Sequence, residues 1–220
     1  FWEQVPIVDP YEKNPVTYRT YQVNRDLQIW LVEGRDYRSP NSMPDGPAKT
    51  LWGKQQIAWL QRTLLDSEAT FKILISPTPL IGPDSATKRD SHCNIGGFQH
   101  ERNEFFEWLT RHGFLEKNFY LVCGDRHWQY HAVHPSGFDE FSCGAICDAN
   151  AFLAIQPGQQ GSTDPEGKIR HKYTQSGQSG GFLKIGITPR ANAASSQAEF
   201  SFFEERGELL YRYSKTSRIR

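Results

Sequence analysis

The sequence predicts an α/β fold, with a mixed sheet that ends in an antiparallel hairpin. Between residues 27 and 123, short apolar runs alternate with segments whose apolar residues recur at helical spacing, which is the strand–helix–strand order of α/β proteins. Between residues 181 and 213 the apolar residues alternate at period two, as in strands with one buried face. The length of 220 residues suits one domain with a substantial core.

The composition argues against several classes of protein. Lys and Arg number 25, as do Asp and Glu, so the formal net charge is zero, and the sequence has no basic stripe typical of a nucleic-acid-binding module. No run approaches the roughly 18–20 consecutive apolar residues of a membrane span. The sequence also has no motif of P-loop nucleotidases, dinucleotide-binding folds, α/β-hydrolases or zincins.

The first third of the chain predicts one buried strand between two irregular segments. Residues 1–25 are polar, aromatic and interrupted by prolines, which is typical of an extended surface segment or an edge strand. Residues 27–32 (Leu-Gln-Ile-Trp-Leu-Val) predict a mostly buried strand. Residues 39–49 contain three prolines and a glycine and therefore predict a loop.

Two amphipathic helices are predicted in the middle of the chain. Apolar residues recur three and four positions apart in residues 54–65 and 99–112, and Gly113 is a natural stop for the second helix. Between these helices, residues 71–76 predict a buried strand that ends at a proline. Residues 81–97, which carry glycines and charges, predict a long loop.

The rest of the chain predicts further strands and one irregular excursion. Residues 119–123 are a continuous apolar run and predict a third buried strand. Residues 156–180 are rich in Gly, Gln, Ser and Pro and predict a mobile surface excursion. Alternating strands are predicted at residues 181–188, 198–202 and 209–213, of which the last two form the hairpin.

The strongest candidate site follows the third buried strand, at residues 124–127 (Gly-Asp-Arg-His). Ligands bind at the carboxyl ends of strands in open α/β sheets. Asp125 and His127 are two residues apart, so in an extended turn both can face one cavity, and a carboxylate with an imidazole suits zinc, iron or manganese rather than calcium alone. In the alternative interpretation Asp125 caps the next segment and His127 packs beside Trp128. His131 could orient a ligand or be a half-buried, hydrogen-bonded histidine.

Other polar residues fall at the same predicted edge or before a helix. Arg35 and Arg38 follow the first strand and could hold a phosphate, or could pair with Glu33 and Asp36. Polar residues at 90–102 precede or open the second helix, where an anion is favoured. The alternative there is a solvated loop whose Asp and Asn side chains bond their own backbone.

Four motifs occur in one order and together resemble the alkaline phosphatase D (PhoD-like) family of calcineurin-type metallophosphoesterases. They are residues 31–38, 52–60, 75–80 and 123–128, and residues 140–144 follow them. The resemblance covers most of residues 18–150. It implies the C-terminal half of an αββα sandwich whose metal pair lies at strand ends.

The resemblance implies a metal-dependent phosphoester hydrolase of the phosphodiesterase or alkaline phosphatase type. In such enzymes two metal ions assist the in-line attack of hydroxide on a small-molecule phosphoester, and the ions are divalent or trivalent: Fe, Ca, Zn and Mn are not distinguished. Asp125 and His127 match the segment that supplies late metal ligands. The implied catalytic residues are Arg126, Asp90 and Asn94, and the implied substrate-binding residues are Arg35, Arg38 and Arg102.

The family's first metal-binding segments have no match in this chain. They comprise an early Gly-Asp strand end and an Asp-Asp-His-Glu-like segment, and a two-metal site needs about three to five ligands on each ion. The chain begins at Phe1, and its one methionine, Met43, is internal. We therefore expect residues 1–220 to be one domain, the C-terminal part of a metallophosphatase-like domain, with the N-terminal half of the same protein as its partner. Alone it should be weakly active or inactive.

Two other functions remain open at this point. The first alternative is a non-catalytic binding or scaffold domain that descends from such an enzyme and holds no metal. The second is a small zinc module built on Cys143, Cys147 and nearby histidines, although the C-x-x-x-C spacing has no second ligand pair at zinc-finger distance. Because members of the family are commonly exported, the resemblance also implies an extracytoplasmic location.

Overall fold

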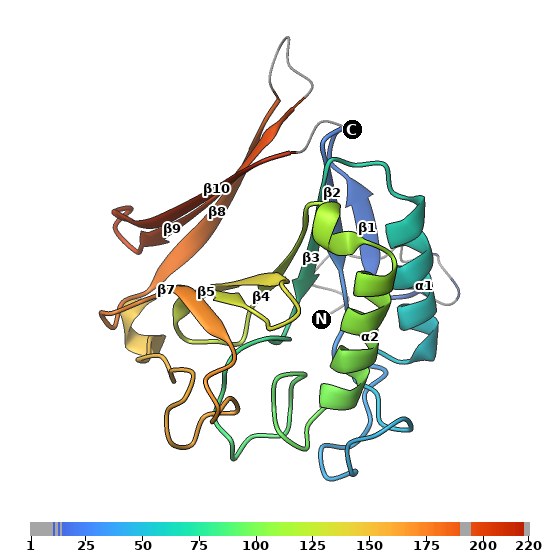
Figure 1. Cartoon of the computed structure of the whole chain (residues 1–220), viewed down its shortest axis with the longest axis horizontal. Helices are drawn as coiled ribbons and strands as arrows, with labels where there is room; N and C mark the ends of the chain where they lie inside the picture. The colour runs from blue at the N-terminus through green and yellow to red at the C-terminus, as the bar shows by residue number, and fades with distance from the viewer. Residues whose placement is uncertain (1–10, 12, 14, 190–194, 218–220) are drawn as a thin grey trace.

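A seven-stranded mixed sheet forms the centre of the protein (Figure 1). The computed structural model describes residues 11, 13, 15–189 and 195–217. The strand order is β1-β2-β3-β4-β6-β5-β7, and β2, β3, β4 and β6 run parallel to one another. The strands are β1 (Arg19–Gln22), β2 (Leu27–Leu31), β3 (Phe71–Ser76), β4 (Phe119–Cys123), β5 (Gln129–Val133), β6 (Asp139–Cys143) and β7 (Arg170–Thr174).

Two helices cover one face of this sheet (Figure 1). Helix α1 (Lys54–Asp66) and helix α2 (Gln99–Arg111) are the crossover connections to β3 and β4, as parallel strands require. Leu60 of α1 and Leu109 of α2 are fully buried in one core with Trp30, Leu74 and Leu121 of the sheet. Helix α2 ends at a glycine in the left-handed region, at position 113, before the short η1 (Phe114–Glu116).

A second sheet packs on the other face. It contains β8 (Gly181–Thr188), β9 (Gln197–Glu204) and β10 (Leu209–Thr216) in the order β10-β9-β8, all antiparallel. The ring of Phe200 in β9 stacks on Phe141 of β6 at 4.1 Å between centroids, and Phe202 belongs to the same core. The Gln129 side-chain amide donates to the carbonyl of Phe203 at 3.0 Å, which ties the two sheets together.

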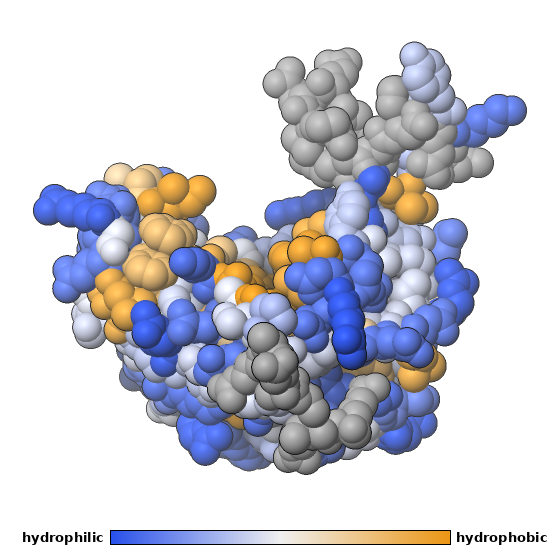
Figure 2. Space-filling model, turned by 90° about the horizontal axis from the view of Figure 1, so that it is seen from above, coloured by the Kyte–Doolittle hydropathy of each residue, from blue (hydrophilic) through white to orange (hydrophobic). Residues whose placement is uncertain are grey.

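The result is three layers: helices, central sheet and small sheet. The described residues contain no helix on the outer face of the small sheet, so of the expected αββα sandwich three layers are present in this part of the chain. Seen from above, the molecule is hollowed between its two sides, and hydrophobic surface lines part of the hollow (Figure 2). Within the described ranges, no helix is long and apolar enough to cross a membrane.

Most predicted elements are present, and one prediction is wrong. The strands predicted at residues 71–76, 119–123 and 181–188 coincide with β3, β4 and β8, and β9 and β10 form the predicted hairpin. Residues 156–180 are not simply a surface excursion, because they contain β7, which pairs with β5 at the edge of the central sheet. Thr163 and Asp164 in the same segment are buried. Their polar partners, rather than apolar periodicity, order this region.

His131 lies between the two sheets, fully buried. Its Nε2 donates to the Asp139 carboxylate at 2.7 Å, and its Nδ1 accepts from the Tyr211 hydroxyl at 3.0 Å. Lys172 also donates to Asp139, at 2.8 Å. Burial lowers the pKa of His131, and the bond to Asp139 opposes this shift only in part. The structure therefore shows the hydrogen-bonded core histidine that was one of the two interpretations.

Histidine burial makes stability depend on pH. Burial lowers the pKa of His131 and His171, and burial together with Arg102 lowers that of His134 to about 4. Such groups are neutral in the folded protein and protonate on unfolding at about 6.5. At a pH between the lowered pKa in the folded protein and the ordinary pKa of about 6.5, the unfolded chain binds more protons than the folded protein. We therefore expect the free energy of unfolding to fall as the pH falls from about 6.5 towards 4. Urea unfolding at several pH values measures this slope.

The contribution of His134 can be isolated by substitution. His134→Gln should make the slope shallower over this pH window, because one titrating group is gone. Ser136→Ala is the matched control, since it removes the 2.7 Å bond from Ser136 to His134 Nδ1 and keeps the imidazole. An unchanged slope in His134→Gln would contradict the assignment.

Candidate functional site

Predicted site residues follow three neighbouring strands at one edge of the central sheet. Because β2, β3 and β4 run parallel, their carboxyl ends lie together, at the lower edge in Figure 1. Arg35 and Arg38 follow β2, Asp90 and Asn94 follow β3, and residues 124–127 follow β4. The long loops of the protein gather at this edge.

The turn after β4 has a strained backbone. The amide of Arg126 donates to the carbonyl of Gly124 at 2.7 Å, and Asp125 between them has φ 65°, a γ-turn with positive φ. A non-glycine residue in this region is uncommon, and such strain is concentrated at functional sites. The turn sends alternate side chains to opposite sides: Asp125 and His127 are exposed, whereas Arg126 is buried.

His127 is oriented like a metal ligand. Its Nδ1 lies within hydrogen-bond distance of the Asn150 backbone carbonyl, and its ring packs against Phe152 with centroids 4.8 Å apart. A carbonyl only accepts, so the neutral ring carries its proton on Nδ1, which leaves the Nε2 lone pair free. Histidine ligands commonly donate their second ring N–H to a carbonyl in this way. The Nε2 lone pair of His127 and the exposed carboxylate of Asp125 are thus donors of the kind that metal ions bind.

These two ligands do not make a complete metal site. In the part of the chain that the structure describes, no group of three or more His, Cys, Asp or Glu side chains is placed to hold a metal ion. This also applies to the zinc module considered above, since Cys143 and Cys147 are free thiols with no such group around them in that part. A metal ion held by Asp125 and His127 would need further ligands from outside the described residues.

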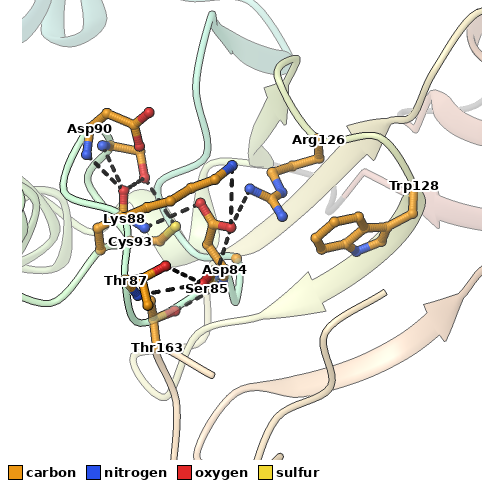
Figure 3. Close-up of polar contacts among 12 residues, drawn as sticks. Asp84, Ser85, Thr87, Lys88, Asp90, Cys93, Arg126, Trp128 and Thr163 are labelled. Carbon is orange, nitrogen blue, oxygen red and sulfur yellow. Dashed lines mark hydrogen bonds and ion pairs between the residues drawn. The ribbon is translucent and has the colours of Figure 1, made fainter. Parts of the chain in front are cut away.

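Arg126 lies behind the turn and away from solvent. Its side chain is 3% exposed, its Nη1 is 2.5 Å from Asp84 Oδ1, and its guanidinium carbon lies 3.9 Å from the ring centroid of Trp128 (Figure 3). Burial alone would lower the pKa of Arg126, but the charge of Asp84 and other neighbours outweighs burial and raises it. The expectation that Arg126 acts on the substrate does not match this position. Its guanidinium anchors the turn from inside.

Asp84, the partner of Arg126, was not found from the sequence. It is 1% exposed and lies in the loop between β3 and α2. Its Oδ2 accepts from the Asn94 amide at 3.1 Å, and Lys88 Nζ lies 3.8 Å from its Oδ1 (Figure 3). In the sequence Asp84 follows Gly-Pro in a predicted loop, a context typical of a turn, so no local pattern marks it as buried.

Asn94 is buried and closes its own loop. Its side-chain oxygen accepts from the backbone amides of Asp90 at 3.0 Å and Ser91 at 2.9 Å. This is the backbone-bonding alternative. The side chain does not reach solvent, and the catalytic role expected of Asn94 stays a prediction. Asp90 is half-buried, and its carbonyl accepts from Arg38 Nη2 at 3.1 Å.

Arg38 follows β2 at the same edge of the sheet. Burial, followed by the charge of Arg35, lowers the pKa of Arg38, whereas the charges of Asp90 and Asp125 act to raise it. The proposed pairing of the arginines with acidic neighbours is not seen in the described residues, since the Glu33 carboxylate accepts from the backbone amides of Arg35 at 2.6 Å and residue 36 at 2.7 Å.

Arg102 is directed elsewhere. It lies in α2 and bonds Asn103 of its own helix at 2.8 and 3.0 Å, with a longer contact of 3.5 Å to the carbonyl of Leu80. No contact among the described residues brings it to Asp125 or His127. Its expected role in substrate binding is therefore not supported by its position.

A second buried carboxylate holds the loop that carries Asp84. Glu140 in β6 is fully buried and accepts from the backbone amides of Leu80 at 2.7 Å and Gly82 at 3.0 Å. The Tyr130 hydroxyl donates to it at 2.9 Å. Burial raises the pKa of Glu140, and the backbone amides oppose that shift. Residues 140–144 belong to the resemblance, but their sequence did not indicate this anchoring role.

Comparisons with known proteins agree with the resemblance. The family model of the PhoD-like phosphatases matches residues 1–195. A solved structure described as "Structure of PhoD" is similar, with a TM-score of 0.65 and 16% identity, over 99% of this chain and 45% of that chain. The chain thus spans less than half the length of that protein. A search of curated protein sequences found no significant match. With a family match over most of its length, the chain belongs to the PhoD-like phosphatase family.

Proposed function

We propose that this chain contributes part of the active site of a metal-dependent phosphoester hydrolase, of the phosphodiesterase or alkaline phosphatase type. The observation that carries the proposal is the paired exposure of Asp125 and His127 at the carboxyl end of β4, with Nε2 of His127 free. A carboxylate with an imidazole suits iron, zinc or manganese, and carboxylate oxygens also bind calcium. Membership of the family supports phosphatase chemistry.

The chain's own residues would hold one side of the metal centre. When bound, the ions would lower the pKa of water and neutralise charge on the phosphoryl group. Asp125 and His127 would bind an ion, while Arg126 keeps the turn in place from inside. Two ligands are too few for two ions, and we propose that the N-terminal half of the same protein supplies the rest. The 45% coverage of the PhoD structure supports this proposal.

We propose that two arginines bind the substrate, a small phosphoester. Arg38 is half-buried and Arg35 is exposed, and both follow β2 at the sheet edge where Asp125 follows β4. A guanidinium presents parallel N–H donors that match two phosphate oxygens, which a lysine does not. Arg38 is in addition held by the Asp90 carbonyl, so its position costs less entropy on binding.

A non-catalytic binding domain is the second candidate function. One observation favours it: the described residues bring no third metal ligand to Asp125 and His127. The metal content of the full-length protein separates the two candidates. About two ions per molecule with hydrolysis of an aryl phosphodiester supports the enzyme, and a protein that retains no metal supports the binding domain.

Removing His127 should remove both metal and activity. In the full-length protein, His127→Ala should lower the metal content measured by elemental analysis and reduce turnover of an aryl phosphodiester at least about 100-fold, because the loss of a ligand weakens a site that acts through its metals. His112→Ala is the matched control. His112 is exposed and bonds a carbonyl through Nδ1 at 2.8 Å, but it lies at the far end of α2. Unchanged metal and turnover in His127→Ala would contradict the proposal.

Asp125→Gly should separate stability from function. Glycine adopts φ 65° without strain, so the metal-free protein should gain about 0.5–1 kcal/mol in free energy of unfolding, while metal affinity is lost. Asp125→Asn is the control. Asparagine tolerates this conformation as aspartate does but lacks the charge, so this variant should lose metal affinity without the gain in stability. Urea unfolding with and without metal measures both effects. A metal-free Asp125→Gly protein less stable than the wild type would show that the turn is not strained.

Arg38→Ala should act mainly on substrate binding. The loss of a charge-assisted hydrogen bond, about 1.5–3 kcal/mol, should raise KM about tenfold or more with a smaller change in kcat. Steady-state kinetics of the full-length protein measures the two constants. Arg62→Ala, in an exposed position of α1, is the control. An effect confined to kcat would place Arg38 in the chemical step instead.

A further inference from the structure

Asp84 connects the two loops that carry candidate site residues. Its two carboxylate oxygens take different partners: Oδ1 lies 2.5 Å from Nη1 of Arg126, and Oδ2 accepts from the Asn94 amide at 3.1 Å (Figure 3). Asn94 in turn accepts from the backbone amide of Asp90, whose carbonyl accepts from Arg38. One chain of contacts therefore runs from Arg126 through Asp84 to Arg38.

The backbone of Asp84 is itself fixed on both sides. Its amide donates to the Thr163 hydroxyl at 2.9 Å, and its carbonyl accepts from the Thr163 amide at 2.8 Å. The residues just before it, 80–82, donate their amides to the buried Glu140. A carboxylate held in this way is a rigid anchor, because the loop cannot shift without breaking several hydrogen bonds of buried groups.

Stability alone does not explain a buried pair of this kind. Taking two charges out of water costs about as much as their attraction returns, so apolar side chains of similar volume often stabilise a protein equally well. The pair has a geometric effect instead. Arg126 stands between Asp125 and His127 in the turn, so fixing its guanidinium between Asp84 and Trp128 fixes the direction of both exposed neighbours.

We propose that Asp84 is a positioning residue of the metal and substrate site. Through Arg126 it holds Asp125 and His127 in the orientation that a metal ion needs, and through Asn94 it holds the loop that carries Asp90. Asp84 does not touch metal or substrate. The proposal rests on the proposed function, because it concerns the same metal site.

The test is Co²⁺ binding by the full-length protein, with the visible absorption of Co²⁺ as a report on ligand geometry. Asp84→Asn should weaken Co²⁺ binding about tenfold or more and change the absorption spectrum, as is typical when groups that orient metal ligands are lost. The matched control is Glu101→Gln. Glu101 is also a buried carboxylate, paired with His92 at 2.8 Å, but it bonds the amides of Leu51 and Trp52 rather than the turn. The Glu101→Gln protein should be less stable than the wild type but should keep the wild-type Co²⁺ affinity and absorption spectrum.

A second variant covers the case in which Asp84→Asn does not fold, because it leaves the Arg126 cation buried without a counter-ion. Asp84→Asn/Arg126→Gln removes both charges, and the shorter Gln no longer reaches residue 84. This protein should fold, as judged by circular dichroism, and still bind Co²⁺ about tenfold more weakly. Wild-type affinity and spectrum in whichever variant folds would overturn the positioning role. Failure of the wild-type protein itself to bind Co²⁺ would overturn the proposed function, and the positioning role with it.

Discussion

Parallel pairing of β2, β3 and β4 is the constraint on which the rest of the structure depends. It requires crossover connections, which α1 and α2 provide on one face of the sheet, and it leaves the other face to the small antiparallel sheet. It also brings three chemically rich loops to one edge, although they are far apart in the sequence. The location of the candidate site is therefore a consequence of strand direction. Its residues only have to be polar and to direct their side chains towards that edge of the sheet.

Buried carboxylates give order to the loops at this edge, which have little regular structure of their own. Glu101 binds the amides of Leu51 and Trp52, Glu140 binds the amides of residues 80–82, and Asp84 joins Arg126 to Asn94. Each carboxylate is satisfied by amides or cations, which a buried charge requires. Unpaired backbone amides in these loops would otherwise carry a desolvation cost. The loops are thus held by a few charged side chains instead of by secondary structure.

Elements with local periodicity were predictable from the sequence, and elements defined by distant partners were not. The apolar run of β4 and the helical spacing of apolar residues in α1 and α2 indicate directly which residues are buried. In contrast, β7 lies in a polar segment, and its pairing with β5 makes it a strand. In the candidate site, Asp125 and His127 stood out in the sequence because they directly follow a buried strand. The anchoring roles of Asp84 and Glu140 could not be predicted, since Arg126 and the amide of Leu80, which they bind, are far away in the sequence. Local sequence located Arg126, but the inward direction of its side chain depends on its distant partner Asp84.

The alternation of exposed and buried side chains in residues 124–127 limits how this turn can evolve. A substitution at Asp125 or His127 changes a side chain in solvent and leaves the anchor in place. An insertion or deletion of one residue would instead reverse which side chains are buried. The side chain of Asp125 or His127 would then face Asp84, and the guanidinium of Arg126 would face solvent. Descendants of this protein can therefore exchange the exposed residues, and with them the chemistry, far more easily than they can change the length of the turn.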